Sequence, residues 1–175
     1  SGTSSVCQRL HMTRLWLLML PLAVPFLLAS AIMAQLATTQ PLLWPLELQP
    51  ALSSTFGETR ATAFHFGIDL KTWGKTGYPV RAIDDGWILR VRTSPWGYGR
   101  AVYQRLSDGR IAVYAHLLGF AEPIKSRVLA AQQASRQYSV QLWPEEGEIP
   151  VRRGQVIARS GSSGAGPPHL HVEIR

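Results

Sequence analysis

Short runs of apolar and polar residues, separated by glycine- and proline-rich turns, make up the chain from Pro41 onward. Such a pattern is typical of antiparallel β structure. One hairpin is indicated most strongly, because residues 101–106 and 111–116 flank a turn, residues 107–110, that contains Asp-Gly. We therefore expect these two runs to pair as neighbouring strands.

Further strands are predicted on either side of this hairpin. Residues 79–92 suggest a strand, a turn at 84–86 and a second strand over 87–91, and the final strand is expected over 170–174. Residues 126–137 differ in character and predict one helix, inserted between strands. The expected fold is mainly β: a compact antiparallel β-sheet or sandwich with one inserted helix.

The N-terminal part has the features of an export signal. Arg14 closely follows Met12, and an apolar stretch with two prolines and a small-residue patch at 29–31 extends to Ala34. We interpret residues 1–11 as upstream or non-native and residues 12–34 as a signal peptide. The alternative is an uncleaved membrane anchor, because an apolar run of about 20 residues spans a bilayer. In both cases the following domain is exported, to the periplasm, the cell envelope or the extracellular space.

Composition limits what the rest of the chain can do. A length of 175 residues with 46% hydrophobic residues allows one domain with a core, which we place at residues 41–175. Lys and Arg outnumber Asp and Glu by 18 to 11, but they are spread along the chain, so we expect a basic surface and no nucleic-acid partner. The single cysteine, Cys7, excludes a disulfide framework or a Cys-based metal site.

Two histidines one residue apart start the final predicted strand. In a strand, His169 and His171 point to the same face about 7 Å apart, while Leu170 points into the core. Two imidazoles can therefore face one site. A pair of surface or structural histidines is the other interpretation of so short a motif.

His65 and Asp69 are the second candidate pair. In a flat strand these residues would be roughly 13 Å apart, too far to bind one metal ion. Gly67 allows a bend that would bring them together, and it argues against a helix. The alternative is a bent strand whose aspartate faces solvent.

Together these residues predict a metal centre. His65, Asp69 and one histidine of the 169/171 pair supply three nitrogen or oxygen ligands. Three protein ligands and an open position are typical of catalytic zinc, whereas structural zinc takes a fourth. The remaining histidine of the pair and His116 are then available as outer or acid–base groups.

At this point the sequence resembles the lysostaphin/LytM family of zinc peptidoglycan endopeptidases. Three motifs occur in the family's order: His65 to Asp69, the Tyr-Ala-His-Leu segment at 114–117, and the Gly-Pro-Pro-His-Leu-His segment that ends at His171. The resemblance covers roughly residues 45–175. It implies a zinc-dependent endopeptidase that cuts peptide bonds in the stem peptides or cross-bridges of peptidoglycan during cell-wall remodelling.

The resemblance also implies roles for individual residues. Zn²⁺ would be bound by His65, Asp69 and His171, in a narrow groove of the β fold. His169 and His116 would position the attacking water and stabilise the oxyanion. We expect the groove walls to include Trp96, Tyr98, Ser162 and Ser163, although residues 96–99 also fit a purely structural turn.

Two features depart from the family pattern. The helix-bearing insertion at 121–150 is longer than in the smallest members, so we expect it to reshape one groove wall. The sequence ends at Arg175, directly after the last ligand strand, which indicates a domain truncated at its C-terminus. The alternative function is a non-catalytic LytM-type module that binds the cell wall or activates another wall hydrolase. In either case we expect peptidoglycan as partner, and the membrane only through an uncleaved N-terminal segment.

Overall fold

The computed structural model describes residues 40–60, 64–164 and 166–175. Contacts divide the chain into two units, and the second, Leu42–Arg175, contains nearly all the described residues. The expected signal peptide or anchor at 12–34 and the residues before it lie outside the described part. Within the described ranges, no helix has the length and apolar character that a membrane crossing requires.

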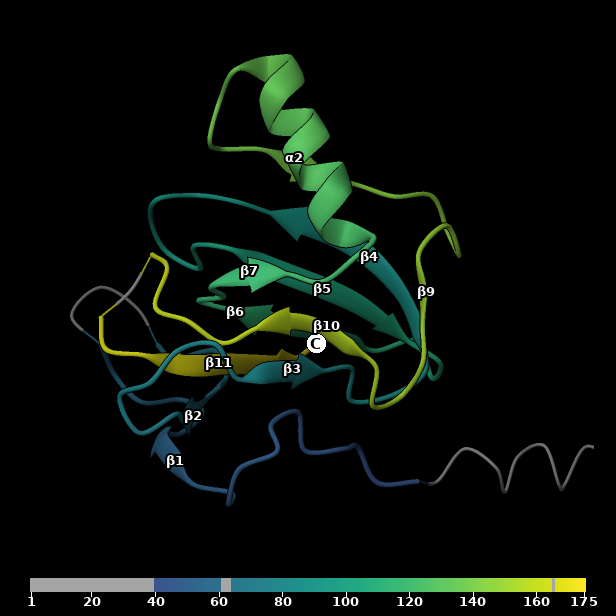
Figure 1. Ribbon diagram of the computed structural model, residues 1–175. Coiled ribbons are helices and arrows are strands. Elements are labelled where there is room, and N and C mark those ends of the chain that lie inside the picture. Colours follow the sequence, from purple (N-terminus) through teal and green to yellow (C-terminus); the bar gives the residue numbers. More distant parts are fainter. Residues whose placement is uncertain (1–39, 61–63, 165) are drawn as a thin grey trace, which may run out of the picture. The chain divides into compact units, whose positions relative to one another are not determined.

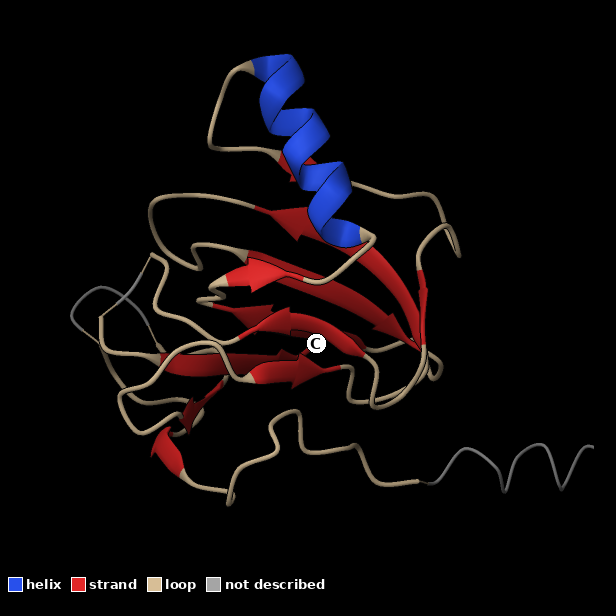
Figure 2. Ribbon diagram, viewed as in Figure 1, coloured by secondary structure: helices blue, strands red, loops and turns tan. Residues whose placement is uncertain are grey.

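An eight-stranded sheet forms most of the second unit (Figures 1 and 2). Every strand pairing in it is antiparallel. In spatial order the strands are β1 (Leu52–Ser54), β2 (Ile68–Lys71), β11 (His169–Ile174), β6 (Ile111–Ala115), β5 (Ala101–Leu106), β4 (Gly86–Arg92) and β8 (Gln141–Leu142); β9 (Pro150–Val151) also pairs with β4.

A three-stranded sheet packs against this larger one. It consists of β3 (Pro79–Arg81), β10 (Val156–Arg159) and β7 (Gly119–Phe120), with β10 in the centre. Buried side chains of both sheets, among them Val80 and Ile157 from the small sheet and Ile88 and Leu170 from the large one, belong to one apolar cluster. The mainly antiparallel β fold expected from the sequence is confirmed.

The predicted hairpin is present in the expected register. Val102 pairs with Tyr114 and Arg105 with Ile111, and the Leu106 amide donates to the Arg110 carbonyl across the turn. The predicted strand–turn–strand at 79–92 also forms, but its two strands belong to different sheets: β3 pairs with β10, and β4 with β5. The turn at 84–86 therefore links the two layers.

The predicted helix is α2 (Ile124–Ser135), the helix of the described residues, which begins two residues before the expected start. It ends where Arg136 adopts a left-handed conformation (φ 54°) and its amide contacts the Gln132 and Gln133 carbonyls. Only Ile124 and Val128 of its side chains are buried. The helix therefore packs against the rest of the domain only through its first turns, and it projects from the sheets in Figure 1.

Candidate metal centre

The register of three adjacent strands positions the candidate ligands. His171 on the central strand β11 lies opposite Asp69 of β2 on one side and opposite Ala115 of β6 on the other. His116 directly follows Ala115. Leu170 is fully buried in the core, so the strand alternation turns His169 and His171 to the opposite face. The predicted alternation of these three residues is confirmed.

His65, Asp69 and His171 form a compact buried cluster. The Nε2 atom of His65 lies 3.1 Å from Asp69 Oδ1 and 2.9 Å from His171 Nδ1, and His171 Nδ1 lies 2.8 Å from Asp69 Oδ1. All three residues are at least 95% buried. The structure therefore brings together the three residues that the sequence suggested as metal ligands.

Gly67 makes this meeting of His65 and Asp69 possible. A Cβ atom added at Gly67 would lie 2.3 Å from the Val172 carbonyl oxygen and 2.8 Å from Glu173 Cγ. Side chains do not tolerate such distances, so only glycine lets the 65–69 segment run this close to β11. The sequence predicted a bend at this glycine, and the structure adds the close approach of two backbones.

Outer hydrogen bonds orient both imidazoles. His65 Nδ1 lies 2.7 Å from the Thr55 carbonyl oxygen, which only accepts, so Nδ1 carries the hydrogen. His171 Nε2 lies 2.9 Å from the Glu173 carboxylate and donates to it in the same way. The lone pairs of His65 Nε2 and His171 Nδ1 are thereby directed at each other and at Asp69, which is how proteins orient metal-binding histidines.

Three electron-rich atoms this close require a positive charge between them. Although burial by itself disfavours the carboxylate, the neighbouring His171 imidazole and Arg60 guanidinium hold the pKa of Asp69 well below its usual value, so Asp69 is anionic. A proton on His171 or a metal ion satisfies the cluster. Two imidazoles and one carboxylate are a donor set that zinc takes at catalytic sites, so the residues fit this ion.

Glu173 belongs to the site and was not predicted from the sequence. It is 2% exposed and accepts hydrogen bonds from His171 Nε2, the Tyr98 hydroxyl and Arg175 Nε. Burial alone would raise its pKa, but these hydrogen bonds lower it, so the residue is a buried carboxylate. Its position two residues after His171, on the same strand face, is the signal that could have identified it.

His116 lies beside the cluster in an unusual backbone conformation. Its φ angle is 59°, and its amide donates to the Tyr98 carbonyl at 3.0 Å. The Nδ1 atom lies 3.0 Å from the Ser163 carbonyl oxygen and therefore carries the hydrogen. Burial lowers the pKa of His116 to about 4, which leaves a neutral imidazole with a lone pair on Nε2.

His169 lies on the other side of the same space. Its Nδ1 donates to the Pro167 carbonyl at 2.7 Å, and its buried Nε2 has no hydrogen-bond partner among the described residues. That Nε2 lies 3.6 Å from Asp69 Oδ1, and the ring centroids of His169 and His116 are 4.6 Å apart. Both predicted assisting histidines thus lie next to the cluster, each with one nitrogen uncommitted.

A cavity of about 420 Å³ opens over this centre, with His65, His116, His171, Tyr98, Phe66 and Arg92 in its wall. Among the residues expected in the groove walls, Tyr98 lines it. Trp96 is 78% exposed and Ser162 is exposed, and neither belongs to the lining. Ser163 has a structural contact instead: its hydroxyl donates to the Leu117 carbonyl and accepts from the Arg100 amide. Its carbonyl holds His116, as described above.

Comparisons with known proteins give the following similarities. No family model matches the chain. Over 112 residues, 63% of the chain, it is 35% identical to the DD-carboxypeptidase/endopeptidase Mpg of Neisseria meningitidis; over 148 residues, 83% of the chain, it is 28% identical to the outer membrane antigenic lipoprotein B of Haemophilus influenzae. The chain spans only 20% and 29% of the length of these relatives.

A solved structure shows which fold the chain has. The chain is similar to a variant of the catalytic domain of the prophage-encoded M23 protein EnpA from Enterococcus faecalis, with a TM-score of 0.51 and 26% identity. The match covers 72% of this chain and 80% of that domain. The resemblance indicated by the sequence motifs is confirmed, and the chain has the fold of the LytM/M23 peptidases.

Proposed function

We propose that this domain is a zinc-dependent endopeptidase that hydrolyses peptide bonds in the stem peptides or cross-bridges of peptidoglycan. The observation that carries the proposal is the buried cluster of His65, Asp69 and His171 beneath an open cavity, with two further histidines beside it. The names of Mpg and of the M23 protein support a peptidase, and Mpg's name supports cleavage near D-amino acids.

The chemistry divides between the metal and the surrounding side chains. When bound, zinc acts as a Lewis acid on the scissile carbonyl and lowers the pKa of water. His116 and His169 position the attacking water, and His116 Nε2 accepts a proton from it, because its Nδ1–H is already bound to Ser163. The resulting imidazolium can donate to the oxyanion and then protonate the leaving amine.

Other residues keep these groups in place. Glu173 and the Thr55 carbonyl fix the two imidazole ligands from outside, so that neither rotates when substrate enters. Arg60 Nη2 binds the second carboxylate oxygen of Asp69 at 2.7 Å, which leaves Oδ1 to face the metal position. Preorganised ligands of this kind favour catalysis because little reorganisation accompanies the reaction.

The same proposal includes the location of the domain. Peptidoglycan lies outside the cytoplasm, so the enzyme must be exported to the periplasm, the envelope or beyond. The H. influenzae relative is named as an outer membrane lipoprotein, which supports an envelope location. The partners that we propose are peptidoglycan peptides.

A non-catalytic module that activates another hydrolase is the competing function. Loss of a ligand or of an assisting histidine would favour it, but this chain has all five residues in one site. The test is to incubate the purified chain with peptidoglycan and identify the soluble products by mass spectrometry. New peptide amino termini support the proposal; intact cross-links, or release only when a second hydrolase is added, would favour the module.

A further inference from the structure

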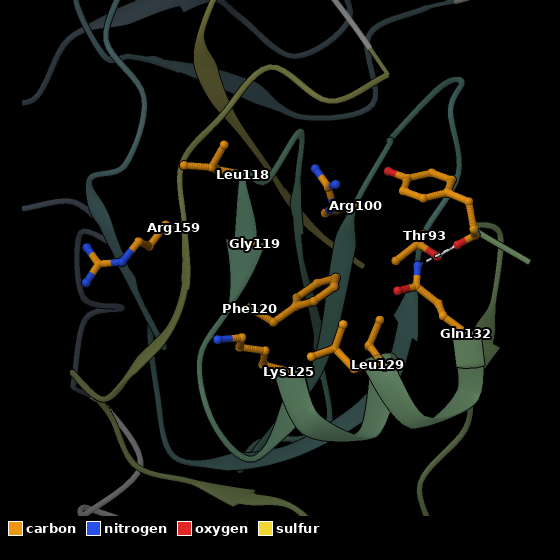
Figure 3. Close-up of a pocket in the computed structure, with 11 residues that line it drawn as sticks. Thr93, Arg100, Leu118, Gly119, Phe120, Lys125, Leu129, Gln132 and Arg159 are labelled. Carbon is orange, nitrogen blue, oxygen red and sulfur yellow. Dashed lines mark hydrogen bonds between the residues drawn. The ribbon is translucent and has the colours of Figure 1, made fainter. Parts of the chain in front are cut away.

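A second cavity, of about 490 Å³, lies between α2 and the edge of the small sheet (Figure 3). Leu118, Phe120, Val128 and Leu129 give it an apolar lining. Its far wall is fixed by the Tyr138 carbonyl, which accepts hydrogen bonds from Gln132 Nε2 at 2.7 Å and from Thr93 Oγ1 at 2.6 Å. The insertion that carries α2 is thus anchored by hydrogen bonds, and it forms one side of a defined cavity.

The charged residues of this cavity are all cations. Arg100, Lys125 and Arg159 belong to its lining, and no carboxylate does among the described residues. The guanidinium of Arg100 lies 5.5 Å from the centre of the Tyr138 ring and, in the described part of the chain, makes no ion pair with a carboxylate. By contrast, Arg127, on the same helix as Lys125 but outside the lining, pairs with Glu148.

Figure 3 shows how these cations are arranged. Leu129 projects from α2 toward Phe120, the Lys125 amine turns to the side, and Phe120 lies between α2 and the Arg100 guanidinium, whereas Arg159 lies at the periphery. Arg159 also donates to the Gly77 carbonyl at 3.0 Å. Arg100 and Lys125 are therefore the two lining cations that flank Phe120, while Arg159 is held by a backbone carbonyl. An apolar lining flanked by two cations suits an anionic group on a short aliphatic chain.

Two paired segments connect this cavity with the metal centre. The His116 amide donates to the Tyr98 carbonyl and the Leu117 amide donates to the Arg100 carbonyl, at 3.0 and 3.1 Å. Tyr98 and His116 line the cavity over the metal centre, and Arg100 and Leu118, each two residues further on, line the second one. Cα atoms two residues apart are separated by at most about 7 Å in any backbone conformation, so the two linings are neighbours and one short peptide has the length to contact both.

We propose that the cavity beside α2 is an additional substrate subsite, which binds a carboxylate-bearing part of the peptidoglycan peptide on one side of the scissile bond. This inference rests on the proposed function and extends it. The Arg100 and Lys125 side chains bind the carboxylate, and Phe120 and Leu129 contact the adjoining aliphatic carbons. The inserted helix then contributes to substrate selection.

Substitution of Lys125 tests the subsite with a matched control. Lys125→Gln removes one cavity cation, Lys125→Arg retains the charge, and Arg127→Gln removes a charge from the same helix outside the cavity. With a stem-peptide dimer bearing free carboxylates, Lys125→Gln raises KM about threefold, and the double variant with Arg100→Gln about tenfold, with kcat within about twofold of the original. Lys125→Arg and Arg127→Gln keep the original KM. The effect disappears with the amidated dimer.

Binding provides a readout that does not need hydrolysis. Fluorescence anisotropy with a fluorescein-labelled stem peptide, free or amidated, is measured on the full chain and the same variants. A Lys125-dependent preference for the free carboxylate supports the subsite even if the chain cleaves nothing, in which case only the proposed function fails. Three results overturn the subsite. The first is equal affinity of Lys125→Gln and Arg127→Gln for the free peptide, and the second is an equal loss of affinity of Lys125→Gln for the free and the amidated peptide. The third is tight binding of a poly-glutamate peptide in place of the stem peptide.

Discussion

His171 and Glu173, two residues apart on strand β11, are joined by a buried hydrogen bond of 2.9 Å between Nε2 and Oε1. The bond leaves His171 Nδ1 facing His65 and Asp69. A carboxylate in this outer position fixes the tautomer of a metal-binding histidine and makes it more basic. Under the proposed function, Glu173 would therefore tune the zinc site without being one of its ligands.

Replacing Glu173 should weaken zinc binding. We expect Glu173→Ala to lower zinc affinity about 10- to 100-fold, measured by competition with a chromogenic chelator, because His171 loses its orienting partner. Tyr98→Phe is the control, since it removes one hydrogen bond to the carboxylate but leaves the carboxylate on His171; its affinity should stay within about threefold. Unchanged affinity in Glu173→Ala would refute this role.

Removing a proposed ligand and removing an assisting histidine should have separable effects. His171→Ala should lose most bound zinc and all activity. His116→Ala should retain zinc and lose turnover, because the hydrogen bonds of His116 go to the backbone carbonyls of Ser163 and Tyr98 and not to the cluster. Elemental analysis and peptide release on the same preparations measure both quantities. Activity in the first variant, or zinc loss in the second, would reverse the assignment.

His169 provides an independent check of the assisting role. Its Nε2 is buried, lacks a hydrogen-bond partner among the described residues and lies 3.6 Å from Asp69 Oδ1. We expect His169→Ala to keep its zinc and to lower kcat about 10²- to 10⁴-fold, as removal of a general acid–base group does. A change in KM alone, with kcat preserved, would show that His169 contacts substrate without taking part in the chemistry.

Gly67 should be essential for stability. Gly67→Ala places a Cβ 2.3 Å from the Val172 carbonyl oxygen, so we expect a loss of at least about 2 kcal/mol in the free energy of unfolding. Urea unfolding in the presence of chelator separates this effect from metal binding. Gly166→Ala, where no atom lies within 4 Å of the added Cβ, is the control and should change stability by less than about 0.5 kcal/mol. Equal stability of the two variants would contradict the close approach.

The sequence predicts those features that depend on local patterns. The Asp-Gly turn identifies the hairpin, and the period of a strand places His169 and His171 on one face with Leu170 in the core. Gly67 indicated a bend for the same local reason. The family resemblance, which rests on the order of three motifs, then implied that segments far apart in the sequence meet in one site.

Features that depend on contacts between distant segments were not predictable in this way. The contact of Gly67 with β11 follows from strand register. The position of Ser163, whose carbonyl holds His116, follows from hydrogen bonds of its loop to Leu117 and Arg100. The division of β3 and β4 between two sheets, and the cavity enclosed by α2, depend on how layers pack. The predictions for the groove walls were accordingly the least specific. Of the four residues expected there, only Tyr98 lines the cavity over the cluster, and Trp96, Ser162 and Ser163 do not.

The central claim is that His65, Asp69 and His171 hold a catalytic zinc ion. The most direct measurement combines zinc content by elemental analysis with release of soluble peptides from purified peptidoglycan, before and after treatment with chelator and again after zinc is restored. We predict near one zinc per chain, loss of peptide release with the chelator, and recovery with zinc. A folded chain that binds no zinc, or peptide release that the chelator leaves unchanged, would contradict the account.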